Sequence, residues 1–252
     1  MAPVIIVTGA SRGLGASIAK KLLSAPHSAN LVLVARTASS LEVLKAEYPG
    51  QVEIVTGDVA DEQTNKNIVR AAVEKFGRVD GIIFNAAILE PISVVAKSSI
   101  VEWKKLYDTN FFSLISTFTE AAPYLRESKG KIVFISSGAT RHYYSGWGAY
   151  GSSKAATEHL SATIAAEEPE IISFALDPGV MDTDMQIALR EKHGAEMKKS
   201  EHDRFIKLKS DHALSPPELP GGVAVNLVLH ATKDLSGLAY KFNAAELAGY
   251  RD

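Results

Sequence analysis

The stretch VIIVTGASRGLG, residues 4–15, decides the fold of this 252-residue chain. An apolar run is followed by a glycine-rich turn, and the amphipathic pattern of a helix begins at Gly13. A strand, a tight turn and a helix in this order open a βαβ unit, and glycine lets a phosphate approach the backbone. The start of the helix would offer free N–H groups and its positive dipole end to a pyrophosphate. A purely structural turn is the alternative.

Short apolar segments alternate with amphipathic ones along the rest of the chain. Strands are predicted at residues 4–8, 31–35, 52–56, 81–85, 131–136, 171–176 and 238–242. Helices are predicted at residues 13–24, 38–47, 62–76, 100–126, 148–167 and 217–230. Strands with so little polar alternation are typical of a parallel sheet covered on both faces. We therefore expect one α/β domain over residues 1–252, a doubly wound, Rossmann-type, seven-stranded parallel sheet with helices on both faces.

The composition is that of an ordinary globular protein, with 46% hydrophobic and 22% charged residues. The absence of cysteine excludes disulfides, thiolate nucleophiles and Cys-ligated metal centres. A net charge of -2 provides no field that would attract nucleic acid or an anionic membrane. The N-terminal apolar run is too short for a signal peptide, and no run approaches the roughly 20 residues of a membrane helix. We expect a cytoplasmic protein that binds neither nucleic acid nor membrane.

One charged segment, residues 184–222, interrupts the alternation between the sixth strand and the last helix. Its histidines, His193, His202 and His212, fit no single helical face, so a metal site is not expected. Insertions of this length are often lids or binding loops. We expect a substrate loop with some helix of its own, and a solvated surface excursion is the alternative.

Two arginines indicate which dinucleotide the fold would bind. In such folds an acid about 20 residues past the glycine-rich turn binds the ribose 2′-hydroxyl of NAD. This chain instead has Arg36 at that place, and no acid follows before Glu42. Arg36, with Arg12 in the turn, could pair with the 2′-phosphate of NADP, although both could be solvated surface charges. Asp58 after the third strand is placed to accept from the adenine amino group, or else to cap its loop.

Tyr150 and Lys154 are four residues apart, which places both on one face of a helix. A free tyrosine, with a pKa of about 10, is a poor acid–base catalyst at neutral pH. We expect the lysine cation to lower the pKa of Tyr150, as chemistry that moves a hydride and protonates a carbonyl oxygen requires. A surface pair is the alternative.

Two more polar residues are candidates for the same site. Ser137 follows the fifth strand at the carboxyl edge, where its hydroxyl could bind a substrate oxygen or cap the strand end. Strand alternation sends the side chain of Ser136 the other way. Asn110 lies within a predicted helix, where asparagine is a mediocre helix former. It could hold a water that links Lys154 to solvent, or be an ordinary polar residue.

Together these motifs resemble the short-chain dehydrogenase/reductase family over nearly the whole chain. Its catalytic Asn, Ser, Tyr and Lys correspond to Asn110, Ser137, Tyr150 and Lys154. Within the family, segments such as Leu89-Glu90-Pro91 and Gly146-Trp147 are similar to fungal benzil reductases and, more distantly, to sepiapterin reductases. The family's Asn-Ala-Gly element is Asn85-Ala86-Ala87 here, and a strained Ala87 would weaken cofactor binding.

The resemblance implies a nicotinamide cofactor and a small carbonyl substrate. It implies that Val180 lies against the nicotinamide ring and Thr183 near the carboxamide or pyrophosphate. The predicted contacts of NADP(H) are Gly9, Ser11, Arg12, Gly13, Leu14, Gly15, Arg36, Asp58, Val59, Asn85, Ala86, Tyr150, Lys154, Pro178, Gly179, Val180 and Thr183. The predicted substrate contacts are Ser137, Tyr143, Tyr144, Trp147 and Met185.

We therefore expect an NADPH-dependent carbonyl reductase for a ketone or vicinal diketone, with Tyr150 as general acid and base. A non-catalytic NADP(H)-binding sensor or scaffold would not need Tyr150 and Lys154 in register. An extended-type epimerase or dehydratase is disfavoured, because the spacing in the turn is wrong and a sizeable C-terminal substrate domain is lacking. The apolar faces of the helices at 100–126 and 148–167 are expected to pair chains into a homodimer or homotetramer.

Overall fold

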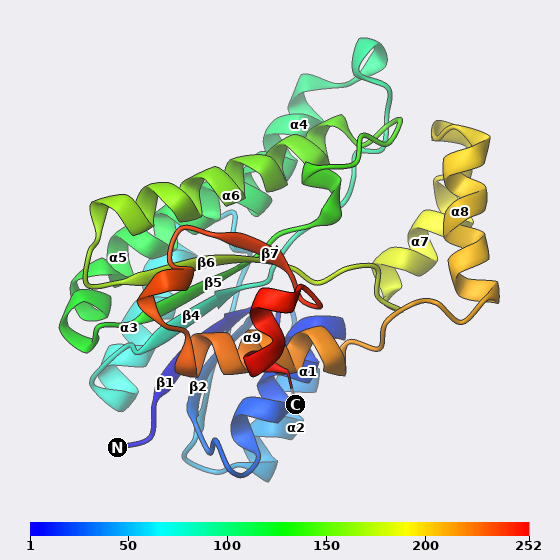
Figure 1. Ribbon diagram of the computed structural model, residues 1–252. Helices are drawn as coiled ribbons and strands as arrows, with labels where there is room; N and C mark the ends of the chain where they lie inside the picture. The colour runs from blue at the N-terminus through cyan, green and yellow to red at the C-terminus, as the bar shows by residue number, and fades with distance from the viewer. Residues whose placement is uncertain (252) are drawn as a thin grey trace.

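The fold is built on one seven-stranded parallel sheet, seen in a computed structural model that describes residues 1–251 (Figure 1). The strands follow the order β3-β2-β1-β4-β5-β6-β7, so that successive strands are added on one side of β1 up to β3 and on its other side from β4 onward. They are β1 (Val4–Thr8), β2 (Asn30–Ala35), β3 (Val52–Thr56), β4 (Gly81–Phe84), β5 (Lys131–Ile135), β6 (Ile172–Asp177) and β7 (Ala239–Lys241). Every pairing is parallel. The predicted Rossmann-type sheet is confirmed.

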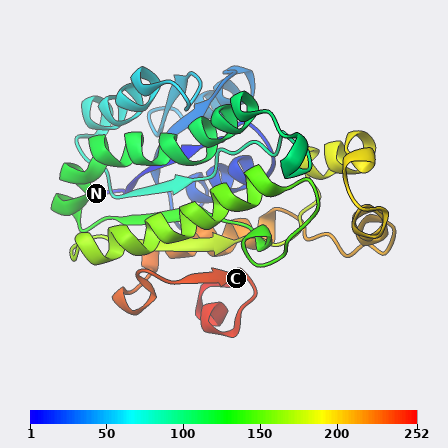
Figure 2. The ribbon, with the colours of Figure 1, turned by 90° about the horizontal axis from the view of Figure 1, so that it is seen from above.

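Helices cover both faces of the sheet (Figures 1 and 2). One layer contains α1 (Gly13–Leu23), α2 (Ser39–Glu47) and α9 (Glu218–His230). The opposite layer contains α3 (Glu62–Phe76), α4 (Ile100–Tyr107), α5 (Ser113–Ser128) and α6 (Gly148–Glu167). Short helical turns are η1 (Val95–Lys97), η3 (Gly138–Thr140), η5 (Lys233–Leu235) and η6 (Ala245–Tyr250). No helix within residues 1–251 is long and apolar enough to cross a membrane.

The alternation of side chains along β1 explains why its sequence has no polar face. All five residues of the strand are buried. Ile5 and Val7 belong to the core beneath α1 and α9, whereas Val4 and Ile6 belong to the core beneath α3 and α5. Because successive side chains point to opposite faces, a strand between two helical layers must be apolar throughout.

The predicted single helix at residues 100–126 is wrong in one respect. A π-helical turn, η2 (Asp108–Phe112), separates α4 from α5. The amide of Asn110 in this turn bonds both backbone groups of Ile88, at 2.8 Å each. These contacts with the segment after β4 hold the extra residue of the turn in place. Single-turn π-bulges of this kind often mark functional sites.

The insertion after β6 does contain helices of its own, α7 (Asp184–Lys192), η4 (Gly194–Glu196) and α8 (Lys199–Ser210). Both views place it at one end of the molecule, beyond the carboxyl edge of the sheet (Figures 1 and 2). Phe205 of α8 is buried, so the insertion is more than a solvated excursion. The last predicted residues of the insertion already belong to α9, which begins at Glu218.

Candidate active site

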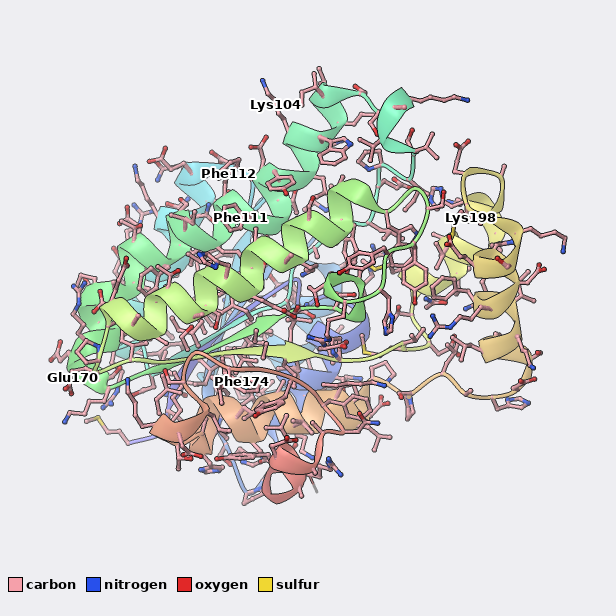
Figure 3. The ribbon with its side chains drawn as sticks, turned by 45° about the horizontal axis from the view of Figure 1, so that its top comes forward. Lys104, Phe111, Phe112, Glu170, Phe174 and Lys198 are labelled. Atoms are coloured by element: carbon pink, nitrogen blue, oxygen red, sulfur yellow. The ribbon has the colours of Figure 1, made fainter. Side chains whose placement is uncertain are left out.

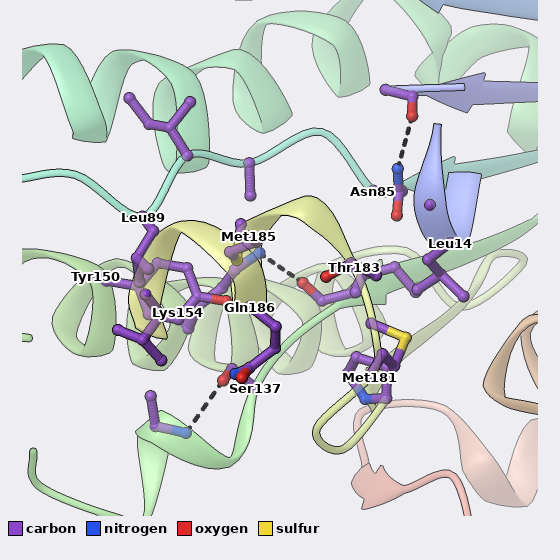
Figure 4. Close-up of a pocket in the computed structure, with 18 of the residues that line it drawn as sticks. Leu14, Asn85, Leu89, Ser137, Tyr150, Lys154, Met181, Thr183, Met185 and Gln186 are labelled. Atoms are coloured by element: carbon purple, nitrogen blue, oxygen red, sulfur yellow. Dashed lines mark hydrogen bonds between the residues drawn. The ribbon is translucent and has the colours of Figure 1, made fainter. Parts of the chain in front are cut away.

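A cavity of about 1120 Å³ lies along the carboxyl edge of the sheet. Its walls come from the β1–α1 turn, the segments after β4, β5 and β6, the start of α6, and the insertion. Open α/β sheets bind ligands at this edge, where the strand order reverses. Figure 4 shows Leu14 and Asn85 in one part of the pocket and Ser137, Tyr150 and Lys154 in another.

Close backbone contacts shape the turn between β1 and α1. Gly9 has a positive φ of 67°, and a Cβ at this position would lie 2.9 Å from the Cα of Ala86. A Cβ at Gly15 would lie 2.3 Å from the backbone oxygen of Gly9. The side chain of Asn85 donates to the backbone oxygens of Thr8 and Gly9, at 2.9 and 3.1 Å. Gly15 is therefore needed for packing beneath the turn. It was predicted to contact the cofactor, but it does not line the cavity.

The start of α1 fits an anionic group. Its N-cap residue, Arg12, provides no side-chain cap, and Gly13 and Leu14 of the first turn line the cavity. Uncapped N–H groups and the helix dipole favour a phosphate at such a place. Arg36, directly after β2, is exposed, lines the cavity and makes no ion pair with any residue of the chain that the structure describes. The guanidinium of Arg12 lies 2.9 Å from the carboxylate of Asp184 in the insertion.

Asp58 and Val59 line the same end of the cavity. One carboxylate oxygen of Asp58 accepts from the backbone N–H of Ala60 at 3.0 Å, so the residue does cap its loop. The side chain is exposed and its second oxygen accepts from no donor within residues 1–251, which leaves an acceptor for a ligand amino group. The two readings of Asp58 are therefore compatible.

Tyr150 and Lys154 lie one turn apart on the buried face of α6, with 7% and 3% of their surfaces exposed. The ammonium nitrogen of Lys154 donates to the backbone oxygen of Ile135 at 2.7 Å, and it lies 5.9 Å from the centre of the Tyr150 ring. Both residues line the cavity. The surface-pair alternative is thus excluded for these two residues.

Burial controls the ionisation of both groups. It raises the pKa of Tyr150 to about 12. The negative charge of Asp177 adds to the rise, whereas a hydrogen bond with Ser137 lowers the pKa. Burial also lowers the pKa of Lys154 to about 8. The expected lowering of the Tyr150 pKa is therefore not met, because desolvation, which disfavours the phenolate and the ammonium alike, outweighs any influence of the Lys154 charge. The phenol is protonated at neutral pH, as a proton donor must be.

The side chains of the serine pair after β5 take different directions. Ser137 lines the cavity, and its hydroxyl accepts from the backbone N–H of Ala139 at 3.1 Å. Ser136 donates to the carboxylate of Glu158 on α6 at 2.6 Å, as the strand alternation predicts. Ser137 therefore caps η3 through its lone pair and still has its own proton to donate.

Asn110 is 1% exposed and does not line the cavity. Besides its two bonds to Ile88, its amide nitrogen lies 3.3 Å from the hydroxyl of Ser153 on α6. The segment after β4, the π-turn and α6 are thus joined at one residue. Its amide oxygen and nitrogen both have protein partners, so the structure shows a role in positioning these elements.

The turn after β6 brings its predicted residues to the cavity. Pro178, Gly179, Val180 and Thr183 all line it. Gly179 has a φ of 70°, and its N–H donates to the Asp177 carboxylate at 2.9 Å. Ala87 also lines the cavity, and it is not among the residues with positive φ. The predicted backbone strain at Ala87 is therefore absent.

Aromatic residues form the part of the cavity beyond Tyr150. Tyr144, Trp147 and Met185 line it as predicted. Tyr143 does not, because its side chain is 90% exposed. Adjacent loop residues point in different directions, and here Tyr144 turns inward to contact Trp147, with ring centroids 4.8 Å apart.

Several lining residues from the insertion were missed by the sequence reasoning. Phe205 of α8 stacks on Trp147 at 5.5 Å, and Arg204 beside it donates to the hydroxyl of Tyr144. Gln186 of α7 also faces the cavity (Figure 4). In the charged, weakly periodic sequence of the insertion, the signal for Phe205 is that it is the single Phe, Tyr or Trp of the segment.

Comparison with known proteins places the chain in a family. Residues 3–194 match the family model described as short chain dehydrogenase. An uncharacterized oxidoreductase of Saccharomyces cerevisiae is 39% identical, with 99% of each chain covered. A benzil reductase ((S)-benzoin forming) of the same yeast is 37% identical, with 98% of each chain covered. The crystal structure of the former superposes with a TM-score of 0.97 at 39% identity, covering 99% of this chain and 100% of that one.

The sheet order and the cavity at its carboxyl edge are those of a dinucleotide-binding fold, and the family model and the relatives make the protein an oxidoreductase. The chain belongs to the short-chain dehydrogenase family, whose members bind a nicotinamide cofactor and act on small molecules. It is similar to the benzil reductases of yeast and Bacillus subtilis among its relatives.

Proposed function

We propose that this protein is an NADPH-dependent carbonyl reductase that acts on a ketone or vicinal diketone. The observation that carries the proposal is the meeting of Ser137, Tyr150 and Lys154 in the cavity that also contains the start of α1. The benzil reductases among its relatives support a diketone as substrate. The free guanidinium of Arg36, and Arg12 once released from Asp184, support a 2′-phosphate on the cofactor.

The bound cofactor would supply the hydride, and the residues of the chain would handle the oxygen. The hydroxyls of Ser137 and Tyr150 donate to the substrate carbonyl oxygen and stabilise the negative charge that develops there. Tyr150, protonated at neutral pH, then transfers its proton to that oxygen. Lys154, hydrogen-bonded to the oxygen of Ile135, provides the nearby positive charge that stabilises the resulting phenolate.

A matched pair of variants tests this assignment. Tyr150→Phe should lower kcat for diketone reduction by about 10²–10⁴-fold while the Kd for NADPH stays within about two-fold. Tyr143→Phe removes the same hydroxyl from a side chain that is 90% exposed and outside the cavity, and it should leave kcat unchanged. NADPH absorbance at saturating diketone gives the rate. Unchanged turnover in Tyr150→Phe would remove the proposed role.

We further propose that the chain forms a homodimer or homotetramer through α4, α5 and α6. Apolar side chains on α4 and on the π-turn that follows it are exposed: Ile100 is 67%, Val101 72% and Phe112 52% exposed. Figure 3 shows Phe111 and Phe112 where the π-turn runs beside α6. Exposed apolar side chains on adjoining elements support an interface there. Light scattering should show a dimer or larger species, and Phe112→Asp should shift it toward the monomer.

A further inference from the structure

The indole nitrogen of Trp147 is a buried donor without a partner. Among residues 1–251, Nε1 of Trp147 is the one buried side-chain nitrogen or oxygen that makes no hydrogen bond. Buried polar groups are nearly always hydrogen-bonded, and an unsatisfied one calls for an explanation such as a missing ligand. Trp147 as a whole is 9% exposed, and it lines the cavity.

Its place in the fold connects it to the proposed proton donor. Trp147 is the N-cap residue of α6, three residues before Tyr150. The two rings meet edge to face, with centroids 5.7 Å apart and an interplanar angle of 86°. Ser137, Tyr150 and Trp147 therefore present three potential donors within one cavity, and two of them are already assigned to the reacting oxygen.

The surroundings of the indole explain why no protein group accepts from it. Phe205 stacks on the ring, with an interplanar angle of 7°, and Tyr144 covers it from the side. Trp147 belongs to a buried hydrophobic cluster that also contains Leu89, Leu106 and Leu189. A charged acceptor would lose its hydration here without an opposite charge, whereas a neutral carbonyl oxygen would lose much less.

Part of the cover over the indole comes from α8, whose Phe205 stacks on the ring. The side chains of α8 tie it to the rest of the chain: Arg204 donates to the hydroxyl of Tyr144, and the ammonium of Lys209 lies 2.6 Å from the carboxylate of Asp182. Glu201 adds a bond to the backbone N–H of Ser145 at 2.8 Å. Because Nε1 itself is buried, a ligand in the cavity can accept from it only when part of its cover moves aside, and Phe205 of α8 belongs to that cover.

We propose that Nε1 of Trp147 donates a hydrogen bond to the second carbonyl oxygen of a vicinal diketone whose first carbonyl is held by Ser137 and Tyr150. The inference rests on the proposed function and deepens it, because it makes Trp147 a determinant of substrate specificity. A monoketone brings no second oxygen and leaves the donor unpaired. Sites that hydrogen-bond a substrate group discriminate strongly against analogues that lack it.

Two substrates and two variants test the inference. Benzil and its analogue with CH₂ in place of one carbonyl share a carbon skeleton and differ at the second oxygen. Trp147→Phe keeps an aromatic ring and removes the donor, and it should lower the ratio of kcat/KM for benzil over the monoketone about ten-fold. The kcat/KM for the monoketone should change less than about two-fold. Trp103→Phe, a tryptophan outside the cavity, should leave the ratio unchanged.

A second measurement does not depend on turnover. The chain has two tryptophans, so wild-type protein labelled with ¹⁵N should show two indole N–H resonances, which Trp103→Phe assigns. With NADP⁺ present, benzil should move the Trp147 resonance downfield, as hydrogen bonding does, and the monoketone should not. This test on wild-type protein also decides the matter if Trp147→Phe fails to fold.

The outcomes separate the inference from the proposed function. A benzil preference that survives in Trp147→Phe, with no benzil-specific shift of the indole resonance, overturns the inference and leaves the carbonyl reductase intact. A benzil-specific shift in a protein that reduces neither ketone overturns the proposed function and supports the diketone site. Equal shifts with both ketones would also overturn the inference, because the second oxygen would then play no part.

Discussion

The guanidinium of Arg12 and the carboxylate of Asp184 form an ion pair 2.9 Å long that joins the turn after β1 to the first residue of α7. Both side chains are largely exposed, at 68% and 61%. The same arginine is a candidate to bind the 2′-phosphate of the cofactor. If Arg12 binds the 2′-phosphate as proposed, the insertion and the cofactor would compete for one cation.

Replacing Asp184 by Asn should strengthen NADPH binding, because Arg12 would then be free for the phosphate. An exposed pair of this kind is worth about 0.2–1 kcal/mol, so we expect the Kd for NADPH to fall by no more than about five-fold. The Kd for NADH should not change. Fluorescence titration measures both constants. Asp203→Asn, which removes a carboxylate paired with Lys199 in the same insertion, is the control. Weaker NADPH binding in Asp184→Asn would show that Asp184 helps to form the site.

Arg36→Ala should reduce the preference for NADPH over NADH about 10- to 100-fold, because it removes a charge-assisted, potentially bidentate contact with the 2′-phosphate. The kcat/KM ratio for the two cofactors, at a fixed concentration of one ketone, reports the change. Arg70→Ala on α3 alters an exposed arginine away from the cavity and should leave the ratio as it is. An unchanged ratio in Arg36→Ala would locate the discrimination elsewhere.

Lys154 should make the stability of the protein depend on pH. Burial lowers its pKa from 10.5 in the unfolded chain to about 8, so between these values the unfolded state binds more protons. Stability therefore rises with pH across this window, and below it the buried charge costs about 3 kcal/mol. Tyr150, whose pKa is raised from 10.0 to about 12, opposes this gain only above pH 10.

Urea unfolding between pH 7.5 and 9.5 measures this effect. Lys154→Met should be more stable than the wild type at pH 7.5, and the difference should shrink as pH rises. Lys199→Met, at a lysine whose side chain is 88% exposed, should follow the wild-type curve. Parallel curves for Lys154→Met and the wild type would show that Lys154 titrates normally.

Gly15→Ala should destabilise the fold, since the added methyl would lie 2.3 Å from the backbone oxygen of Gly9 and 2.6 Å from the side-chain nitrogen of Asn85. Overpacking of this kind costs about 1–3 kcal/mol. The Tm should fall by several degrees and NADPH affinity should fall with it, because the turn itself must shift. Gly249→Ala meets nothing within 4 Å and should change stability by less than about 0.5 kcal/mol. A Gly15→Ala variant as stable as the wild type would contradict the packing shown here.

The sheet could be predicted from the sequence because its signal is local. Continuous apolar runs such as residues 4–8 predict buried parallel strands without knowledge of their neighbours, and their boundaries agree to about one residue. The π-turn could not be predicted, since it depends on the bonds of Asn110 to Ile88, a residue 22 positions away. Periodicity continues through this region and conceals the interruption.

The candidate site also has features that the sequence predicts and features that it does not. Tyr150 and Lys154 could be placed on one helical face from their spacing alone. Their pKa values could not, because the degree of burial is set by packing that only the whole fold defines. The inward turn of Tyr144 rather than Tyr143, and the arrival of Phe205 from α8, likewise depend on contacts between distant segments.

The two ends of the cavity have separate origins in the chain. Proton transfer would depend on β5 and α6, within the two helical layers, whereas much of the surface that a ketone would touch comes from α7 and α8 outside them. Grafting a different segment between Thr183 and α9 would thus redirect which compounds are accepted and leave the proposed proton-transfer residues and the turn after β6 in place. The architecture lends itself to diversification by exchange of one peripheral module.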